Sequence, residues 1–189
     1  TLDQFSTDWT EVTKKRGFGE IIGHEKELSQ IETILSRGEV NNTLVVGEPG
    51  IGRLSIIHSL SMKALFCLST PQINAKRVVS LDMASVISRT ESQDEAEAVL
   101  NNIFTEAVSA GNVILVIDDF HNYINQREQK PGIMDISGLI APYLRLPNFQ
   151  IIAITNYAGF HKNIEPDASI LSLFEKVEVA EITDQETIR

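Results

Sequence analysis

Short, uninterrupted runs of apolar residues recur along the chain and mark the expected strands. Such runs, bounded by Gly, Asn or Asp, are typical of strands that are buried on both faces. The strongest is NVILVIDD, in which five consecutive apolar residues lead into two aspartates. Further strands are expected in NNTLVVG, RVVSLDM and FQIIAITN, and the alternating segment KVEVAEI is expected as an edge or terminal strand.

Segments with apolar residues at helical spacing lie between these runs. They cover residues about 25–37, about 53–68 and about 94–109, together with the segment MDISGLIAPYLRL. Because helices alternate with buried strands, the sequence predicts an α/β fold of three layers (αβα) with a five-stranded parallel sheet. The strand ending at Asp118 is expected in the centre, next to the strand that leads into Gly47. Ligands of such sheets bind at the carboxyl ends of the strands.

Composition narrows the class of protein. The 189 residues suffice for one domain, and the net charge of −10 argues against nucleic acid as a partner. No apolar stretch is long enough to span a membrane and the first residues do not resemble a secretory signal, so a cytoplasmic location is expected. Cys67, in the apolar stretch ALFCL, is expected to be a buried thiol. The four histidines are dispersed, which argues against a metal site built from them.

A glycine-rich turn follows the first buried strand and opens a helix. It consists of Gly47, Glu48, Pro49, Gly50, Ile51, Gly52, Arg53 and Leu54. This is the context of a phosphate-binding loop, in which backbone N–H groups and the helix N-terminus surround phosphate oxygens. The full pattern, G-x-x-x-x-G-K-[ST], needs a lysine where Arg53 stands and a Mg²⁺-binding hydroxyl where Leu54 stands. The alternative is a glycine-rich turn that binds no ligand.

The strand NVILVIDD would deliver acidic residues to the same edge of the sheet. In phosphate-loop ATPases a similar strand carries an acid associated with Mg²⁺, which makes Asp118 the candidate metal residue. The next position is usually a glutamate that orients the attacking water. Here it is Asp119, whose side chain is one methylene shorter. The alternative is a buried strand with a polar turn, although the loop and strand together are more specific than either alone.

Longer segments carry a family resemblance. ILSRGEVNNTLVVGEPGIG is similar to I-L-S-R-R-x-K-N-N-P-x-L-I-G-E-P-G-V-G-K-T, NVILVIDDFHNYI to N-V-I-L-F-I-D-E-L-H-x-L-V, and SLDMASVIS to L-D-M-G-A-L-V-A. These patterns belong to the first ATPase domain of Clp-type protein unfoldases, which are ring-forming members of the AAA+ superfamily. The resemblance covers nearly the whole chain in the same order. It implies that residues 1–189 form the large αβα subdomain of a longer protein, without the helical lid.

The resemblance also implies roles for individual residues. ATP or ADP would lie against Ile21, Ile22 and Gly23 with its adenine and against Gly47 to Arg53 with its phosphates. Asn156 would sense the γ-phosphate by holding a water. Two family features are missing: Ser172 and Leu173 replace the paired arginines that reach a neighbour's site, and the pore-loop motif Lys-Tyr-Arg-Gly aligns with Glu91–Asp94.

Three functions remain open at this point. The first is a Clp-like module that binds nucleotide but hydrolyses it poorly, and acts beside other AAA+ domains of a ring that handles a protein client. The second is a working ATPase, in which Arg53 and Asp119 suffice and an active neighbour supplies the arginine. The third is a protein-interaction scaffold that binds no nucleotide. Leu54 offers no ligand for Mg²⁺, which argues against that metal as a cofactor of this site.

Overall fold

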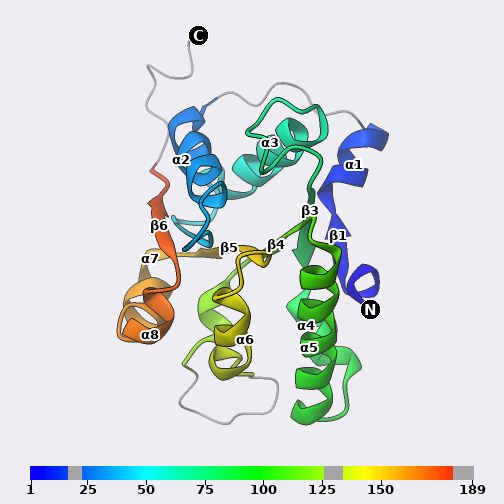
Figure 1. Cartoon of the computed structure of the whole chain (residues 1–189). Helices are drawn as coiled ribbons and strands as arrows, with labels where there is room; N and C mark the ends of the chain where they lie inside the picture. Colours follow the sequence, from blue (N-terminus) through cyan, green and yellow to red (C-terminus); the bar gives the residue numbers. More distant parts are fainter. Residues whose placement is uncertain (17–22, 126–133, 181–189) are drawn as a thin grey trace.

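The computed structural model describes residues 1–16, 23–125 and 134–180. Its centre is a six-stranded sheet in the order β1-β3-β4-β5-β2-β6 (Figure 1). The strands are β1 (Ser6–Asp8), β2 (Thr43–Val46), β3 (Arg77–Leu81), β4 (Val113–Ile117), β5 (Gln150–Thr155) and β6 (Glu175–Glu178). All neighbours pair in parallel except β1, which runs antiparallel to β3. The predicted five-stranded parallel sheet is therefore confirmed and gains an edge strand.

The predicted neighbour of β2 was wrong. The sequence placed β4 beside β2, but β5 lies between them and pairs with both. Thr155, at the end of β5, consequently stands between the phosphate loop and the acidic residues that follow β4. The carboxyl ends of β2, β4 and β5 still meet at one edge of the sheet, as expected for a parallel sheet that binds ligands there.

Helices cover both faces of the sheet (Figure 1). One layer contains α1 (Trp9–Arg16), α2 (Glu25–Leu35) and α3 (Arg53–Leu65). The other contains α4 (Met83–Arg89), α5 (Gln93–Ala110), α6 (Ser137–Leu144) and α8 (Ala168–Leu171). Short turns complete the described chain: η1 (Leu2–Gln4), η2 (Phe120–Tyr123), α7 (Tyr157–Gly159) and η3 (Phe160–Ile164). The three-layer αβα prediction is confirmed.

The two faces of the sheet explain why its strands are continuously apolar. Along β4, Ile114 and Val116 belong to the core beneath α2 and α3, whereas Val113, Leu115 and Ile117 belong to the core beneath α5 and α6. All five residues are buried. Since successive side chains of a strand point to opposite faces, a strand covered on both sides needs apolar residues at every position.

Local signals set the ends of the longest helix. Ser92 caps α5 by accepting a hydrogen bond from the backbone N–H of Glu95 at 3.2 Å, and Asp94 and Glu95 lie in the first turn. Gly111 ends the helix in a left-handed conformation with φ of 69°. The segment aligned with the family's pore loop, Glu91–Asp94, is thus an exposed helix start that carries acidic side chains.

Helix α3 is shorter than predicted, and this overturns the expectation for the cysteine. The helix ends at Leu65, and Cys67 follows in a left-handed conformation with φ of 55°. Its thiol is exposed, as are the neighbouring side chains of Phe66 and Leu68. The apolar spacing simply continues past the point where the helix stops.

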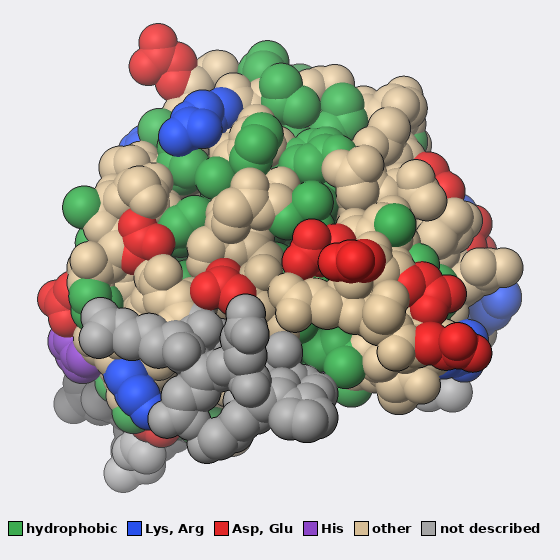
Figure 2. Space-filling view, turned by 90° about the horizontal axis from the view of Figure 1, so that it is seen from below, with side chains coloured by type: hydrophobic (Ala, Val, Ile, Leu, Met, Phe, Trp, Pro, Cys, Tyr) green, Lys and Arg blue, Asp and Glu red, His purple; other side chains and the backbone are tan. Residues whose placement is uncertain are grey.

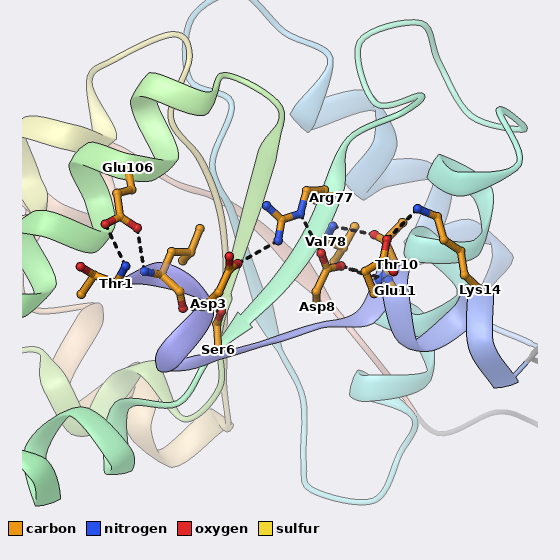
Figure 3. Close-up of polar contacts among 11 residues, drawn as sticks. Thr1, Asp3, Ser6, Asp8, Thr10, Glu11, Lys14, Arg77, Val78 and Glu106 are labelled. Carbon is orange, nitrogen blue, oxygen red and sulfur yellow. Dashed lines mark hydrogen bonds and ion pairs between the residues drawn. The ribbon is translucent and has the colours of Figure 1, made fainter.

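Arg77 of β3 and side chains of the first ten residues hold the antiparallel strand β1 at the edge of the sheet (Figure 3). Arg77 on β3 donates to the carboxylates of Asp8, at 2.7 Å, and Asp3, at 3.0 Å. These contacts raise the pKa of Arg77, the Asp8 hydrogen bond most, while burial opposes them. The hydroxyl of Thr10, a buried residue, accepts the backbone N–H of Val78 at 3.0 Å. The segment therefore covers the unpaired edge of β3.

No helix in the described parts of the chain is long and apolar enough to cross a membrane. Those residues also contain no group of three or more His, Cys, Asp or Glu side chains that could hold a metal ion.

Candidate nucleotide-binding site

The glycine-rich turn connects β2 directly to α3. Its first residue, Gly47, is buried and donates its N–H to the carbonyl of Thr155 at 3.0 Å, which fixes the turn against the end of β5. Gly50 and Gly52 then adopt φ values of 89° and 100°, in the region that L side chains rarely occupy. Helix α3 begins at Arg53, immediately after Gly52. The sequence prediction of a strand, a glycine turn and a helix is confirmed.

The backbone of this turn offers hydrogen-bond donors. Among the described residues, neither Gly50 nor Gly52 donates its N–H to another group. Both lie at the N-terminus of α3, where the helix dipole favours an anion. Free N–H groups beside glycines with positive φ form the concave anion site of phosphate loops. The loop therefore fits a phosphate group.

Arg53 lies across the loop to which it belongs. Its Nη1 donates to the carbonyl oxygen of Gly47 at 3.2 Å, and its Nη2 lies 3.7 Å from Asp118 Oδ1 and 3.9 Å from Asp119 Oδ1. The Arg53 side chain is only 8% exposed, whereas those of Asp118 and Asp119 are 39% and 50% exposed. The positive charge at the lysine position therefore faces the site and contacts both acidic residues.

The two aspartates follow β4 in different backbone conformations. Asp118 accepts the backbone N–H of Asp119 through Oδ1 at 2.9 Å. Asp119 has φ of 47°, a left-handed conformation, and precedes the short turn η2. The same Oδ1 of Asp118 therefore faces both this N–H and the guanidinium of Arg53. Both acids that follow β4 therefore lie within 4 Å of the Arg53 guanidinium.

The last residue of β5, Thr155, and the residue after it, Asn156, form a second polar group at this edge. The hydroxyl of Thr155 lies 2.9 Å from Nδ1 of His121, and Oδ1 of Asn156 accepts the N–H of Gly159 at 2.7 Å. Burial has the largest effect on the pKa of His121 and lowers it. The charge of Asp119 raises this pKa, and the charge of Arg53 lowers it further. The amide oxygen of Asn156 thus caps α7, and this use competes with its predicted role in holding a water.

His24 is a site residue that sequence reasoning missed. It precedes α2 with φ of 59°, and its Nε2 lies 2.7 Å from the carbonyl oxygen of Ile51. A Cβ atom at Gly52 would lie 2.7 Å from the same Nε2. The ring therefore packs directly on the phosphate loop. Only its place after the expected adenine segment could have drawn attention to it.

Most of the other residues predicted for the site are exposed to solvent or lie outside the described residues. Leu54, at the position of the metal-binding hydroxyl, is 44% exposed. Glu48 and Pro49 are exposed, and Glu48 accepts the N–H of Tyr157 at 3.4 Å. Gly23 has φ of 96°, while Ile21 and Ile22 lie outside the described residues. Ser172, at a family arginine position, is exposed on the end of α8.

A phosphate loop on a parallel sheet, with acidic residues at the end of another strand at the same edge, defines a phosphate-loop nucleotide-binding fold. The model of the family described as "ATPase family associated with various cellular activities (AAA)" matches residues 43–181. That match includes the loop, both aspartates and Asn156. The chain therefore belongs to the AAA family.

Similar proteins narrow the family to the Clp type. The chain is 35% identical over its full 189 residues to the "ATP-dependent Clp protease ATP-binding subunit ClpC" of Staphylococcus saprophyticus, and 34% identical to that of Staphylococcus epidermidis. It spans 23% of the length of each. In the solved structure of the S. cerevisiae Hsp104–ADP complex, the fold is the same with a TM-score of 0.86 and 23% identity. That match covers 99% of this chain and 26% of the Hsp104 chain.

Proposed function

We propose that this domain binds ATP or ADP, hydrolyses ATP poorly, and serves as an assembly or regulatory module in a protein-remodelling ring. The observation that carries this proposal is the position of Arg53. Its buried guanidinium spans the phosphate loop and pairs with both acids that would otherwise serve hydrolysis. The site therefore keeps a positive charge that can bind a phosphate, whereas the two carboxylates that would activate water are paired with Arg53.

The binding half of the proposal rests on the loop. The N–H groups of Gly50 and Gly52 and the guanidinium of Arg53 would hold the phosphates. The adenine would lie near Gly23, the last residue of the segment aligned with the family's adenine pocket, and near His24, which follows that segment. Bound ATP supplies a phosphoanhydride, the bond whose hydrolysis drives work in ATPases. Arginine presents a planar fork of donors that suits phosphate oxygens, although its geometry differs from that of lysine.

The impairment of hydrolysis rests on three positions. Asp119 has one methylene less than the expected glutamate, and a misplacement of about 1 Å can lower a rate roughly 10²-fold. Its carboxylate also lies 3.9 Å from Arg53, an ion pair that holds it beside the loop. Ser172 and Leu173 provide no positive charge for a neighbouring site. An arginine in that role contributes about 10³–10⁵ in rate.

The role in an assembly is argued from the relatives. Those relatives are called ATP-binding subunits of an ATP-dependent Clp protease, and this chain spans 23% of their length. We therefore infer that the domain acts beside other AAA+ domains and that a protein is the client.

Acidic side chains border an apolar region on the face in Figure 2, where no continuous basic patch is visible. With a net charge of −10, this surface does not suit nucleic acid.

A titration with a fluorescent ADP analogue tests binding, and steady-state phosphate release from ATP tests turnover. We expect saturable binding without release above background. Arg53→Ala should abolish binding, whereas Arg37→Ala, which removes an arginine paired with Glu175 beyond the C-terminal end of α2, should leave it unchanged. Sedimentation over a concentration series with and without nucleotide tests assembly. Robust release would favour a working ATPase, and absence of binding would favour a scaffold.

A further inference from the structure

Magnesium, the metal that the family uses with nucleotide, does not fit this site. In phosphate-loop ATPases the metal is held by the hydroxyl that follows the loop's lysine and by an acid at the end of another strand of the sheet. Leu54 stands at the hydroxyl position, offers no ligand atom and is 44% exposed. Asp118, the acid, is paired with Arg53 Nη2, and Asp119 shares the same nitrogen. The two positions that would hold the metal are thus either apolar or already paired.

The cation that takes part in these pairs is a side chain of the loop itself. The guanidinium of Arg53 is held by the Gly47 carbonyl, its side chain is 8% exposed, and arginine carries its charge at every working pH. A divalent cation bound between the two carboxylates would lie within a few ångströms of this fixed positive charge. The repulsion is substantial in a partly buried site, because the effective dielectric is lower than that of water.

We propose that Arg53 is a tethered cation that replaces the divalent metal, so that the site excludes Mg²⁺ and takes metal-free ADP or ATP. The nucleotide part of this inference rests on the proposed function. The metal part rests on Leu54 and on the contacts of Arg53 with Asp118 and Asp119, and it does not depend on nucleotide binding. The bound phosphates receive their positive charge from the guanidinium and from backbone N–H groups of the loop.

The pairing of Arg53 with the two carboxylates predicts that Asp118→Asn raises ADP affinity, the opposite of the effect expected in a metal-dependent site. In the absence of metal, the two carboxylates compete with phosphate for the guanidinium and also repel the phosphate. Asp118→Asn should therefore tighten metal-free ADP binding, by about fivefold for one unit charge a few ångströms away. In a site that depends on Mg²⁺, the same substitution would remove a metal-associated acid and weaken binding.

Two measurements on the chain test the inference. The first is a titration of ADP with excess EDTA and with excess Mg²⁺, for the wild type and Asp118→Asn. The second is a titration of Mn²⁺ without nucleotide, in which the loss of the electron paramagnetic resonance signal of the free ion reports binding. The Mn²⁺ titration compares the wild type, Arg53→Met, which frees the carboxylates, and Arg53→Lys, which retains a charge. Circular dichroism checks that each variant is folded, and Arg53→Lys retains the test if Arg53→Met does not fold.

We expect equal ADP affinity in EDTA and Mg²⁺, tighter binding by Asp118→Asn, no Mn²⁺ binding by the wild type, and Mn²⁺ binding by Arg53→Met. If Arg53→Met is unfolded, Arg53→Lys should bind Mn²⁺ more tightly than the wild type, since a compact ammonium reaches less far. A tenfold gain in ADP affinity from Mg²⁺, or Mn²⁺ binding by the wild type, would overturn the inference and leave nucleotide binding intact. Absence of ADP binding in both buffers would overturn the proposed function. The Mn²⁺ series would still decide the role of Arg53, since equal behaviour of wild type and variants contradicts it.

Discussion

The imidazole Nε2 of His24 lies 2.7 Å from the carbonyl oxygen of Ile51 and joins the start of α2 to the phosphate loop. A carbonyl only accepts hydrogen bonds, so Nε2 carries the hydrogen in this contact. The other ring nitrogen, Nδ1, lies 3.8 Å from Glu27. The His24 side chain is 5% exposed, and it contacts the loop between its two glycines of positive φ. The expected adenine segment and the expected phosphate segment are thus mechanically connected through one side chain.

His24→Ala is predicted to weaken ADP binding by about tenfold, or roughly 1.4 kcal/mol, because the loop loses the hydrogen bond that holds the Ile51 carbonyl. His24→Gln should retain most of the affinity, since an amide nitrogen can donate to the same oxygen. The measurement is calorimetric titration of ADP into each variant, with thermal unfolding recorded in parallel. Equal affinities for the two variants would indicate that His24 has no positioning role.

Gly52→Ala is predicted to destabilise the domain by about 1–3 kcal/mol, from backbone strain together with a clash. Its φ is 100°, and an added Cβ would lie 2.7 Å from His24 Nε2. Gly50→Ala introduces strain without a clash, because nothing lies within 4 Å of its Cβ position, and should be milder. Gly38→Ala has neither feature and serves as the control. Chemical denaturation of the three variants should reproduce this order.

Thr10→Val is predicted to destabilise the domain by about 1–3 kcal/mol, because the backbone N–H of Val78 would lose its acceptor in a buried place. The replacement has the same shape, so packing changes little. Thr7→Val, at an exposed position of β1, should alter the free energy of unfolding by less than about 0.5 kcal/mol. Urea denaturation of both variants measures the difference. A similar result for both would mean that the Thr10 hydroxyl does not secure the edge of the sheet.

Stability is predicted to fall as the pH drops below about 6.5. Burial lowers the pKa of His58 and of His121, so the unfolded chain binds protons more readily than the folded chain. The stabilisation is complete above the unfolded pKa of about 6.5 and decreases toward acid until the folded pKa values are passed. Melting temperatures recorded from pH 7.5 to 5 should follow this slope. The double variant His58→Gln, His121→Gln should have a flatter profile if these two groups cause it.

The sequence predicted the strands that lie in the core, because burial on two faces leaves a visible apolar run. Val113–Ile117 and its two aspartates are the clearest case. It did not predict β1, whose residues Ser6–Asp8 are polar and join the sheet through backbone pairing and the Asp8–Arg77 contact. The order of the strands in the sheet could not be predicted either, since an apolar run does not specify which strands pair with it. For that reason β5 was not expected between β2 and β4.

Some features of the candidate site could likewise be predicted from the sequence, and others could not. The loop and both acids could be proposed as candidates from motif spacing, since these motifs are local in sequence. The contact of Arg53 with both acids depends on how the strands are placed, and the histidine over Gly52 depends on how α2 meets the loop. Cys67 illustrates a different failure. The apolar spacing of α3 continues beyond its last turn, so periodicity overestimated both the helix and the burial of the thiol.

The last prediction concerns turnover. Phosphate release by the unmodified chain should equal background, because Leu54 offers the metal no hydroxyl and Asp119 replaces the glutamate that orients water. Asp119→Glu alone should remain inactive, since residues that act as a unit do not contribute independently to a rate. Activity should require Arg53→Lys, Leu54→Thr and Asp119→Glu together, with arginines introduced as Ser172→Arg and Leu173→Arg in an assembled form.

The reason lies in the pairing within the site. As long as Arg53 contacts Asp118 and Asp119, a glutamate at position 119 gains reach but stays beside the same guanidinium. Lysine at position 53 would replace the fork by a compact charge, and threonine at position 54 would return a metal ligand. Phosphate release measured over a protein concentration series tests chemistry and assembly at once. Mg²⁺-dependent release by the unmodified chain, abolished by Asp118→Ala, would contradict impaired hydrolysis and establish a working ATPase.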